Sequence, residues 1–291
     1  MTGVEERQVC EHLLALSRQR AIQFGKIFSW YVVERLVHRL EQSSHREALL
    51  LDGDLLVHAF TGKEVPVQWR ASLTWRPARA SAKLSRAFHD LCRVDGRDHV
   101  RFGSAVQVSA VSRPSIRVRQ FEVIVTGRLC GADCPVSFLV TKDMSREFDS
   151  RDVPFPCLID GELRTRPKAC APEVFMARRV RELSDAGITH LNPQAYSDLH
   201  RLIEAGTLQE GLAIQALATA FRDVKPRFPP NLPLAFTRAT ADNPDLRQIW
   251  ETYQQRARMR ATELPGVLGS IERYLTPLFD AARAVIRKPL C

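Results

Sequence analysis

The chain has 291 residues, of which 45% are hydrophobic and 26% are charged, as is ordinary for a folded protein. This composition excludes a disordered or collagen-like chain, and no stretch approaches the roughly 18 consecutive apolar residues of a membrane span. The first residues, Met1–Glu6, are acidic and lack the basic and apolar regions of a secretory signal. We therefore expect a cytoplasmic protein with no membrane partner.

The cysteines are seven in number and scattered, so a disulfide framework is not expected and reduced core thiols are. Cys130 and Cys134 flank the turn signal Gly131-Ala132-Asp133. The pair could be half of a metal site or the neck of a hairpin. We favour the hairpin, because no second Cys/His pair has the spacing of a zinc site.

The first half of the chain predicts alternating helices and strands. Apolar residues recur at three and four over residues 5–43, which indicates helix with a bend near Gly25. A mixed pattern follows, in this order: a buried strand at Leu49–Leu51, a turn at Asp52-Gly53-Asp54, a short helix from Leu55, a strand at Ala71–Trp75, a helix at Ala80–Cys92, and strands at Ala105–Val111, Ile116–Leu129 and Pro135–Thr141.

The second half predicts helices after a proline-rich crossover. The candidates are Glu173–Ser184, Pro193–Ala205, Leu208–Arg222, Pro244–Arg260 with Asn243 as its cap, and Leu264–Ile286. The fold class is therefore α+β: N-terminal helices, a mixed sheet and a C-terminal helical bundle. We expect two domains, residues 1–160 and residues 161–291.

Positive charge is concentrated in one window. The formal net charge is +9, and residues 70–119 hold eleven Lys and Arg against three Asp. A local excess of this sign attracts phosphate backbones, although it is also typical of a solvated face. The candidate nucleic-acid-binding strip comprises Arg70, Arg76, Arg79, Lys83 and Arg86.

Several motifs, in order, resemble the AbiEii/AbiGii-type nucleotidyltransferase toxin family of bacterial toxin–antitoxin and phage-defence systems. They are Val33–Leu40, Leu50–Leu56, Asp95-Gly96 with Val100–Phe102, Gly127–Val136, Ala171–Arg179, Tyr196–Leu199, and Pro233–Phe236 with Asn243-Pro244 and Gln248–Trp250. No single motif is specific, but their order is.

The resemblance implies a nucleotidyltransferase-like mixed sheet, a Gly-turn at Gly53 that holds a nucleoside triphosphate, and an Asp-x-Asp pair on the next strand. In the family that pair binds two Mg²⁺ ions for phosphoryl transfer. Active relatives transfer nucleotides to the 3′ acceptor end of tRNA, and family toxins are encoded beside a winged-helix antitoxin. The implied partners are thus RNA (tRNA), a nucleotide, and a cognate antitoxin or a defence-complex subunit.

The chain departs from the family at its carboxylates. The Asp-x-Asp pair falls on Ser72-Leu73-Thr74 by spacing, or on Ala80-Ser81-Ala82 by a local Arg-Pro-x-Arg signature, and no Asp or Glu occurs between residues 65 and 89. We prefer the first alignment, because Ala71–Trp75 has strand character. The position of a third family carboxylate reads Phe138-Leu139-Val140, and the Glu-Lys pair of the first bundle helix becomes Arg178-Arg179.

A candidate phosphate-binding cleft follows from these matches: Gly53, Ser72, Thr74, Arg178, Arg179 and Asp198. Arg178 and Arg179 suit phosphate, but Arg179 could equally form an ordinary helix ion pair with Glu182. A relocated metal site could use Asp52, Asp54 and Asp143. The simpler interpretation is that Asp54 caps the helix from Leu55, with Asp52 in the turn.

Three functions remain. The first is a catalytically degenerate nucleotidyltransferase-fold protein that binds RNA or a protein partner and needs no cofactor. The second is an active transferase toxin that modifies RNA or protein, using Mg²⁺ with a nucleoside triphosphate held by Asp52 and Asp54. The third is a defence-complex subunit without a nucleic-acid ligand. The missing carboxylates favour the first.

Overall fold

A computed structural model describes residues 3–62, 70–77, 83–111, 119–142, 150–159, 165–187, 192–222, 228–229, 231–257 and 262–287. The chain divides into two compact units. Among the described residues, the sheet unit comprises those of 3–62 and 70–170, and the helical unit comprises those of 171–287. The sheet unit extends beyond residue 160 because Lys168–Cys170 form a strand of its sheet.

The sheet unit begins with two helices rather than one bent helix. Helix α1 (Gly3–Gln19) ends before Ala21, whose φ of 50° lies in the left-handed region, and α2 (Phe24–Gln42) follows. Buried residues lie on every side of α2, including the charged Glu34 and Arg35. The expected helix over residues 5–43 is therefore interrupted by the connection that follows α1.

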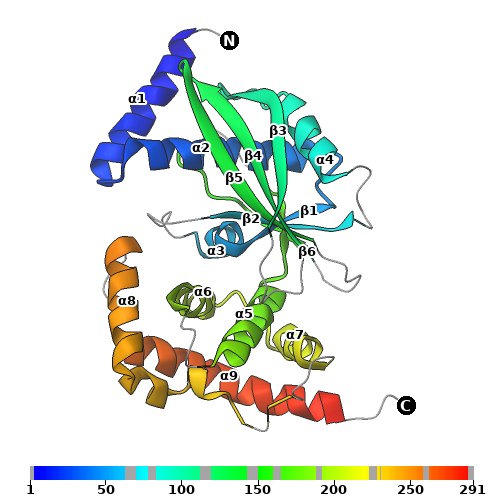
Figure 1. Cartoon of the computed structure of the whole chain (residues 1–291), viewed down its shortest axis with the longest axis vertical. Helices are drawn as coiled ribbons and strands as arrows, with labels where there is room; N and C mark the ends of the chain where they lie inside the picture. Colours follow the sequence, from blue (N-terminus) through cyan, green and yellow to red (C-terminus); the bar gives the residue numbers. More distant parts are fainter. Residues whose placement is uncertain are drawn as a thin grey trace. The chain divides into compact units, whose positions relative to one another are not determined.

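The sheet has seven strands among the described residues, in the order β3-β4-β5-β2-β1-β7-β6 (Figure 1). The strands are β1 (Leu49–Asp52), β2 (Ala71–Trp75), β3 (Arg101–Val111), β4 (Gln120–Leu129), β5 (Ala132–Lys142), β6 (Ser150–Asp152) and β7 (Lys168–Cys170). The sheet is mixed, because β2 runs antiparallel to β1 but parallel to β5. Helix α3 (Gly53–Thr61) connects β1 to β2, and α4 (Leu84–Arg93) precedes β3.

The β4–β5 hairpin turns one face toward α2. Val123, Val125, Val136 and Phe138 on that face are buried. A Cβ added to Gly127 would lie 2.6 Å from Val32 Cγ1, so glycine allows α2 to lie directly against β4. Strands β4 and β5 pair antiparallel up to Leu129 and Ala132, which confirms the predicted hairpin at Cys130–Cys134.

The cysteine prediction is corrected at one pair. Cys10 in α1 and Cys130 in the hairpin turn form a disulfide, although they lie 120 residues apart in sequence. Neither the spacing nor the local sequence of these residues indicates the pairing. Cys92 and Cys134 are not part of a disulfide.

The helical unit has its own core. Its elements are α5 (Pro172–Ala186), α6 (Pro193–Glu204), α7 (Glu210–Arg222), the short 3₁₀ helices η2 (Leu234–Phe236) and η3 (Arg238–Asp242), α8 (Pro244–Ala257) and α9 (Leu264–Arg287). Leu268, Ile271 and Leu275 of α9 are buried in this core. Asn243 caps α8 as predicted, since its side-chain oxygen accepts the backbone N–H groups of Asp245 and Leu246.

The α+β class, with helices before and after a mixed sheet, is confirmed. In the part of the chain that the structure describes, no helix combines the length and the apolar character that crossing a membrane would require.

Candidate functional site

The Gly53 turn lies between the end of β1 and the first turn of α3. Gly53 has a φ of +54°, and a Cβ added there would lie 2.9 Å from Ser72 Cβ and 3.0 Å from Ser72 Oγ on β2. Glycine is therefore required twice, by the left-handed backbone and by the close approach of β2. This geometry explains why a glycine follows the buried strand.

Asp52 is the N-terminal cap of α3. Its Oδ1 accepts the Gly53 N–H at 2.9 Å, and its Oδ2 accepts the Thr74 hydroxyl at 2.6 Å. Both side chains are buried, so the hydrogen bonds compensate for the desolvation of the carboxylate. The capping role expected for Asp54 belongs to Asp52, because the helix begins two residues earlier than predicted.

Asp54 lies inside the first turn of α3 and binds the backbone of Arg70, the residue before β2. Its Oδ2 accepts the backbone N–H of Arg70 at 2.6 Å, and its side chain is buried. A carboxylate near a helix N-terminus is also favoured by the helix dipole. Asp52 and Asp54 thus have structural roles at this turn.

One face of three adjacent strands holds the positions where the resemblance expects carboxylates. The strand register aligns Asp52 of β1 with Ser72 of β2, and Ser72 with Leu139 of β5. Residues aligned across neighbouring strands point to the same face of a sheet, as does Thr74, two residues after Ser72. The row Asp52, Ser72, Leu139 therefore contains a single carboxylate, supplied by β1.

The third member of the proposed relocated metal site, Asp143, lies outside the described residues. Lys142, which precedes it, is aligned with Trp75 at the end of β2 away from Ser72. Within the described ranges no three His, Cys, Asp or Glu side chains converge as metal ligands would.

The arginines of the candidate cleft belong to the helical unit. Arg179 Nη1 lies 2.8 Å from Glu182 Oε2, which is the helix ion pair given as the simpler interpretation. Its Nη2 also donates to Asp198 Oδ2 on α6 at 3.1 Å, and Asp198 is buried. Arg178 is half-buried on α5. Gly53, Ser72 and Thr74 belong to the sheet unit, whereas Arg178, Arg179 and Asp198 belong to the helical unit.

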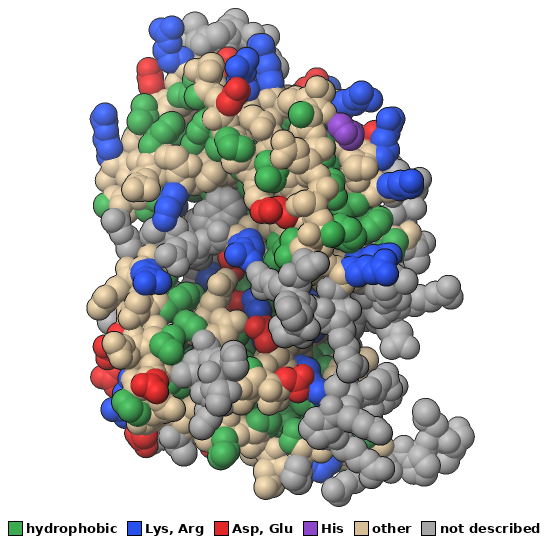
Figure 2. Space-filling view, viewed as in Figure 1, with side chains coloured by type: hydrophobic (Ala, Val, Ile, Leu, Met, Phe, Trp, Pro, Cys, Tyr) green, Lys and Arg blue, Asp and Glu red, His purple; other side chains and the backbone are tan. Residues whose placement is uncertain are grey.

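The basic strip is only partly a surface feature. Arg70, Lys83 and Arg86 are exposed, with Arg86 Nε 3.0 Å from Asp90 Oδ1. Arg76 is buried at 5% exposure, because it directly follows a strand at the middle of the sheet, and it does not belong to an exposed strip. Arg79 lies outside the described residues. On the face seen in Figure 2, Lys and Arg side chains lie at separate points and are interspersed with acidic ones.

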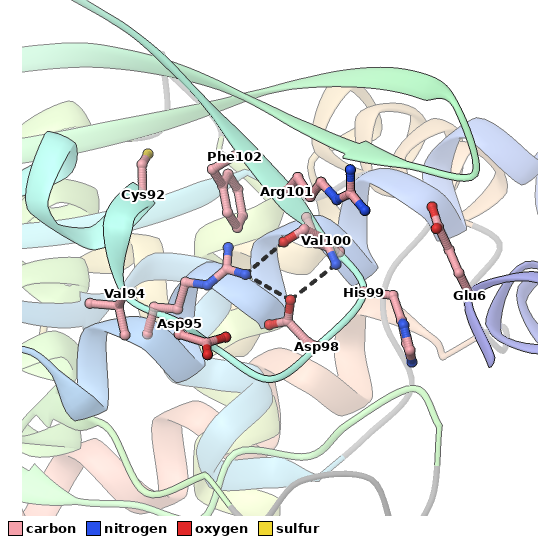
Figure 3. Close-up of a pocket in the computed structure, with 10 residues that line it drawn as sticks. Glu6, Cys92, Val94, Asp95, Asp98, His99, Val100, Arg101 and Phe102 are labelled. Carbon is pink, nitrogen blue, oxygen red and sulfur yellow. Dashed lines mark hydrogen bonds and ion pairs between the residues drawn. The ribbon is translucent and has the colours of Figure 1, made fainter. Parts of the chain in front are cut away.

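A polar pocket of about 410 Å³ in the sheet unit was not predicted. At its base Arg39 of α2 donates from Nη2 to Asp98 Oδ1 and to the Val100 carbonyl, each at 2.7 Å (Figure 3). The Arg39 guanidinium also lies over the Phe102 ring, 4.4 Å from its centroid. Burial lowers the pKa of Arg39 and raises that of Asp98. The sequence feature that could have indicated this ion pair is Arg39, an arginine inside the apolar run of the second helix.

A second buried charge in α2 was also missed. Glu34 Oε1 accepts the Trp30 indole N–H at 2.8 Å and the Leu158 backbone N–H at 2.9 Å, while Oε2 lies 3.4 Å from Arg35 Nη2. Burial raises the pKa of Glu34 to about 7, although Arg35 and the hydrogen bonds oppose the shift. Glu34 thereby joins α2 to the segment that follows β6.

Comparison with known proteins finds similarity at the level of structure. A protein from H. pylori provisionally described as a nucleotidyltransferase is 10% identical, with a TM-score of 0.46 over 89% of this chain and 97% of its own. JHP933 from Helicobacter pylori is 10% identical, with a TM-score of 0.45 over 91% of this chain and 94% of its own. No protein-family model and no curated protein sequence matches the chain. Similarity at this level assigns neither a substrate nor a reaction.

Proposed function

We propose that the protein has a nucleotidyltransferase-like fold related to the AbiEii-type toxins, has lost two-metal catalysis, and acts by binding RNA. The order β1, Gly53 turn, α3, β2 is the arrangement that the resemblance implies for the nucleotide site. The single observation that carries the loss of catalysis is the row Asp52, Ser72, Leu139, in which two of three strands contribute no carboxylate.

The residues at this turn do not fit a pair of magnesium ions. Mg²⁺ is bound through oxygen ligands, usually carboxylates, and it gives up its hydration water reluctantly. The oxygens of Asp52 already accept hydrogen bonds from Gly53 and Thr74, and one oxygen of Asp54 accepts the Arg70 N–H. A hydroxyl at Thr74 stabilises the Asp52 carboxylate without any cation.

RNA is the preferred ligand because the charge excess is large and several basic side chains are exposed. The net charge is +9, and Arg70, Lys83 and Arg86 lie at the surface of the sheet unit. For binding through phosphate contacts, the logarithm of the binding constant falls linearly with the logarithm of the salt concentration, and the number of contacts sets the slope. A protein partner would have to be acidic to use the same residues.

The experiment is a titration of the full chain into fluorescent tRNA at several salt concentrations. We expect Lys83→Glu/Arg86→Glu to weaken binding and to reduce the salt slope by about one for each phosphate that the protein no longer neutralises. Arg7→Glu/Arg18→Glu on α1 is the matched control, because it makes the same charge change at exposed positions away from the strip. Weak binding that ignores salt, or equal weakening in both variants, would refute RNA binding by this surface, and co-purification of an acidic protein without RNA would favour a protein partner.

The alternative is an active transferase that uses Asp52 and Asp54. Transfer of labelled nucleotide to RNA or to protein, abolished in Asp54→Ala, would support it. Because Asp54 also holds the Arg70 backbone, the variant needs a folding check by circular dichroism.

A further inference from the structure

Helix α1 is attached to the β4–β5 turn by a covalent bond. Cys10 lies in α1, and Cys130 occupies the turn between Leu129 and Ala132, which are paired at the ends of β4 and β5. Cys130 and Gly131 both have positive φ, 50° and 75°, as in a two-residue hairpin turn. Asn, Asp or Gly is the usual residue at the first of these positions, so a cysteine there adopts an uncommon backbone conformation for its type.

Helix α1 is also held by buried side chains and by a hydrogen bond. Among its described residues, Val9 and Leu13 are the buried hydrophobic ones, and Leu14 is 40% exposed. Glu6 Oε1 accepts the backbone N–H of Cys130 at 2.5 Å. A helix of this length depends on such packing for most of its stability. The disulfide adds a covalent attachment to this packing.

We propose that the Cys10–Cys130 disulfide is a reducible clasp that holds α1 against the β4–β5 turn. Cys130 is exposed whereas Cys10 is half-buried, so the thiolate of a small thiol of the glutathione class attacks Cys130 Sγ. The S–S bond breaks, Cys10 leaves as a thiolate and takes up a proton. A second small thiol then attacks the mixed disulfide, which releases Cys130 as a thiol and the small molecule as its own disulfide. The small disulfide drives the reverse reaction.

Two other described thiols, those of Cys92 and Cys134, compete poorly in this exchange. Burial raises the pKa of Cys92 and of Cys134 to about 11, so neither is a thiolate near neutral pH. In the structure Cys130 Sγ lies 3.2 Å from the Glu6 carbonyl oxygen. A thiol is a weak hydrogen-bond donor, so this interaction replaces little of the covalent bond.

Release of α1 alters the polar pocket. Glu6 lines that pocket together with Arg39, Asp98 and Arg101, so α1 forms part of its wall (Figure 3). Reduction removes this wall and opens the pocket, whereas oxidation restores it. The clasp does not depend on the proposed function, since it involves neither the Gly53 turn nor the exposed basic residues.

The test is hydrogen–deuterium exchange of the full chain, equilibrated with either reduced or oxidised glutathione. We expect the amides of residues 3–19 to exchange at least tenfold faster in the reduced protein, with the Gly53 turn unchanged. Cys130→Ser should exchange at the fast rate in both buffers, whereas Cys92→Ser, a free cysteine of the same unit, should retain the difference.

Intact mass after alkylation reports the state of the bond in each sample. Two results would overturn the proposal: exchange of α1 that is equal in both buffers while mass confirms the bond has opened, or alkylation of Cys10 and Cys130 in the protein kept with oxidised glutathione. A bond that stays closed in excess reduced thiol would also contradict it.

Discussion

Replacement of Glu34 by glutamine should make the protein more stable at high pH and leave it nearly unchanged at low pH. The folded-state pKa of Glu34 is about 7, against an ordinary value of 4.5, because the side chain is buried. A group with a raised pKa in the folded state contributes its full stability below the unfolded pKa, and that stability is lost as pH rises through the folded pKa. At about 1.4 kcal/mol per pKa unit, the loss between pH 4.5 and 7 is roughly 3 kcal/mol.

Glutamine preserves the acceptor for the Trp30 and Leu158 N–H groups but cannot ionise. Urea unfolding of both proteins at pH 5 and pH 8 measures the effect, and the difference between the proteins removes the contribution of other titrating groups. We expect Glu34→Gln to gain roughly 2–3 kcal/mol relative to the wild type between the two pH values. A constant difference across this range would refute the raised pKa, and Glu34→Ala, which also loses both hydrogen bonds, should be destabilised at either pH.

Three further substitutions test the packing of the sheet unit by urea unfolding. Gly53→Ala should lower the free energy of unfolding by more than the roughly 1–2 kcal/mol that an alanine in the left-handed region costs, because its Cβ would meet β2. Gly131→Ala also has a positive φ but meets open space, so it should cost only that roughly 1–2 kcal/mol. Equal losses in the two variants would contradict the close approach of β2 to Gly53. Thr74→Val should lose about 1–3 kcal/mol by removing the hydroxyl donor, and Thr74→Ser should lose less; the reverse order would exclude the hydrogen bond as the cause. Asp98→Ala should lose about 3–5 kcal/mol, because it leaves the buried Arg39 charge and the Val100 N–H without their acceptor, and a near-neutral effect would mean that the pair is solvated.

The sequence predicts the elements that have strong local patterns. The apolar run before Gly53, the alternation in β2 and the hairpin signal around Gly131 locate the central strands, and the register confirms Ala71–Trp75 as the strand beside β1. The strands β6 and β7 have three residues each, which is too short for a period of two to be recognised.

Features that depend on interactions between distant segments could not be predicted. Arg39 pairs with Asp98, 59 residues away, and Cys10 with Cys130, 120 residues away. The local sequence gives no indication of either partner. The same reason explains the error at Arg76, whose burial follows from its place after β2 rather than from the basic residues around it.

The Gly53 turn, in our proposal, no longer supports two-metal chemistry. Isothermal titration calorimetry of the full chain with each nucleoside triphosphate, with and without Mg²⁺, measures this property at the turn itself. We expect no magnesium-dependent nucleotide binding, with or without tRNA present. Magnesium-dependent binding that Asp52→Asn abolishes in a folded protein would contradict the proposal, because that result requires the carboxylate now bonded to Thr74 to hold a cation.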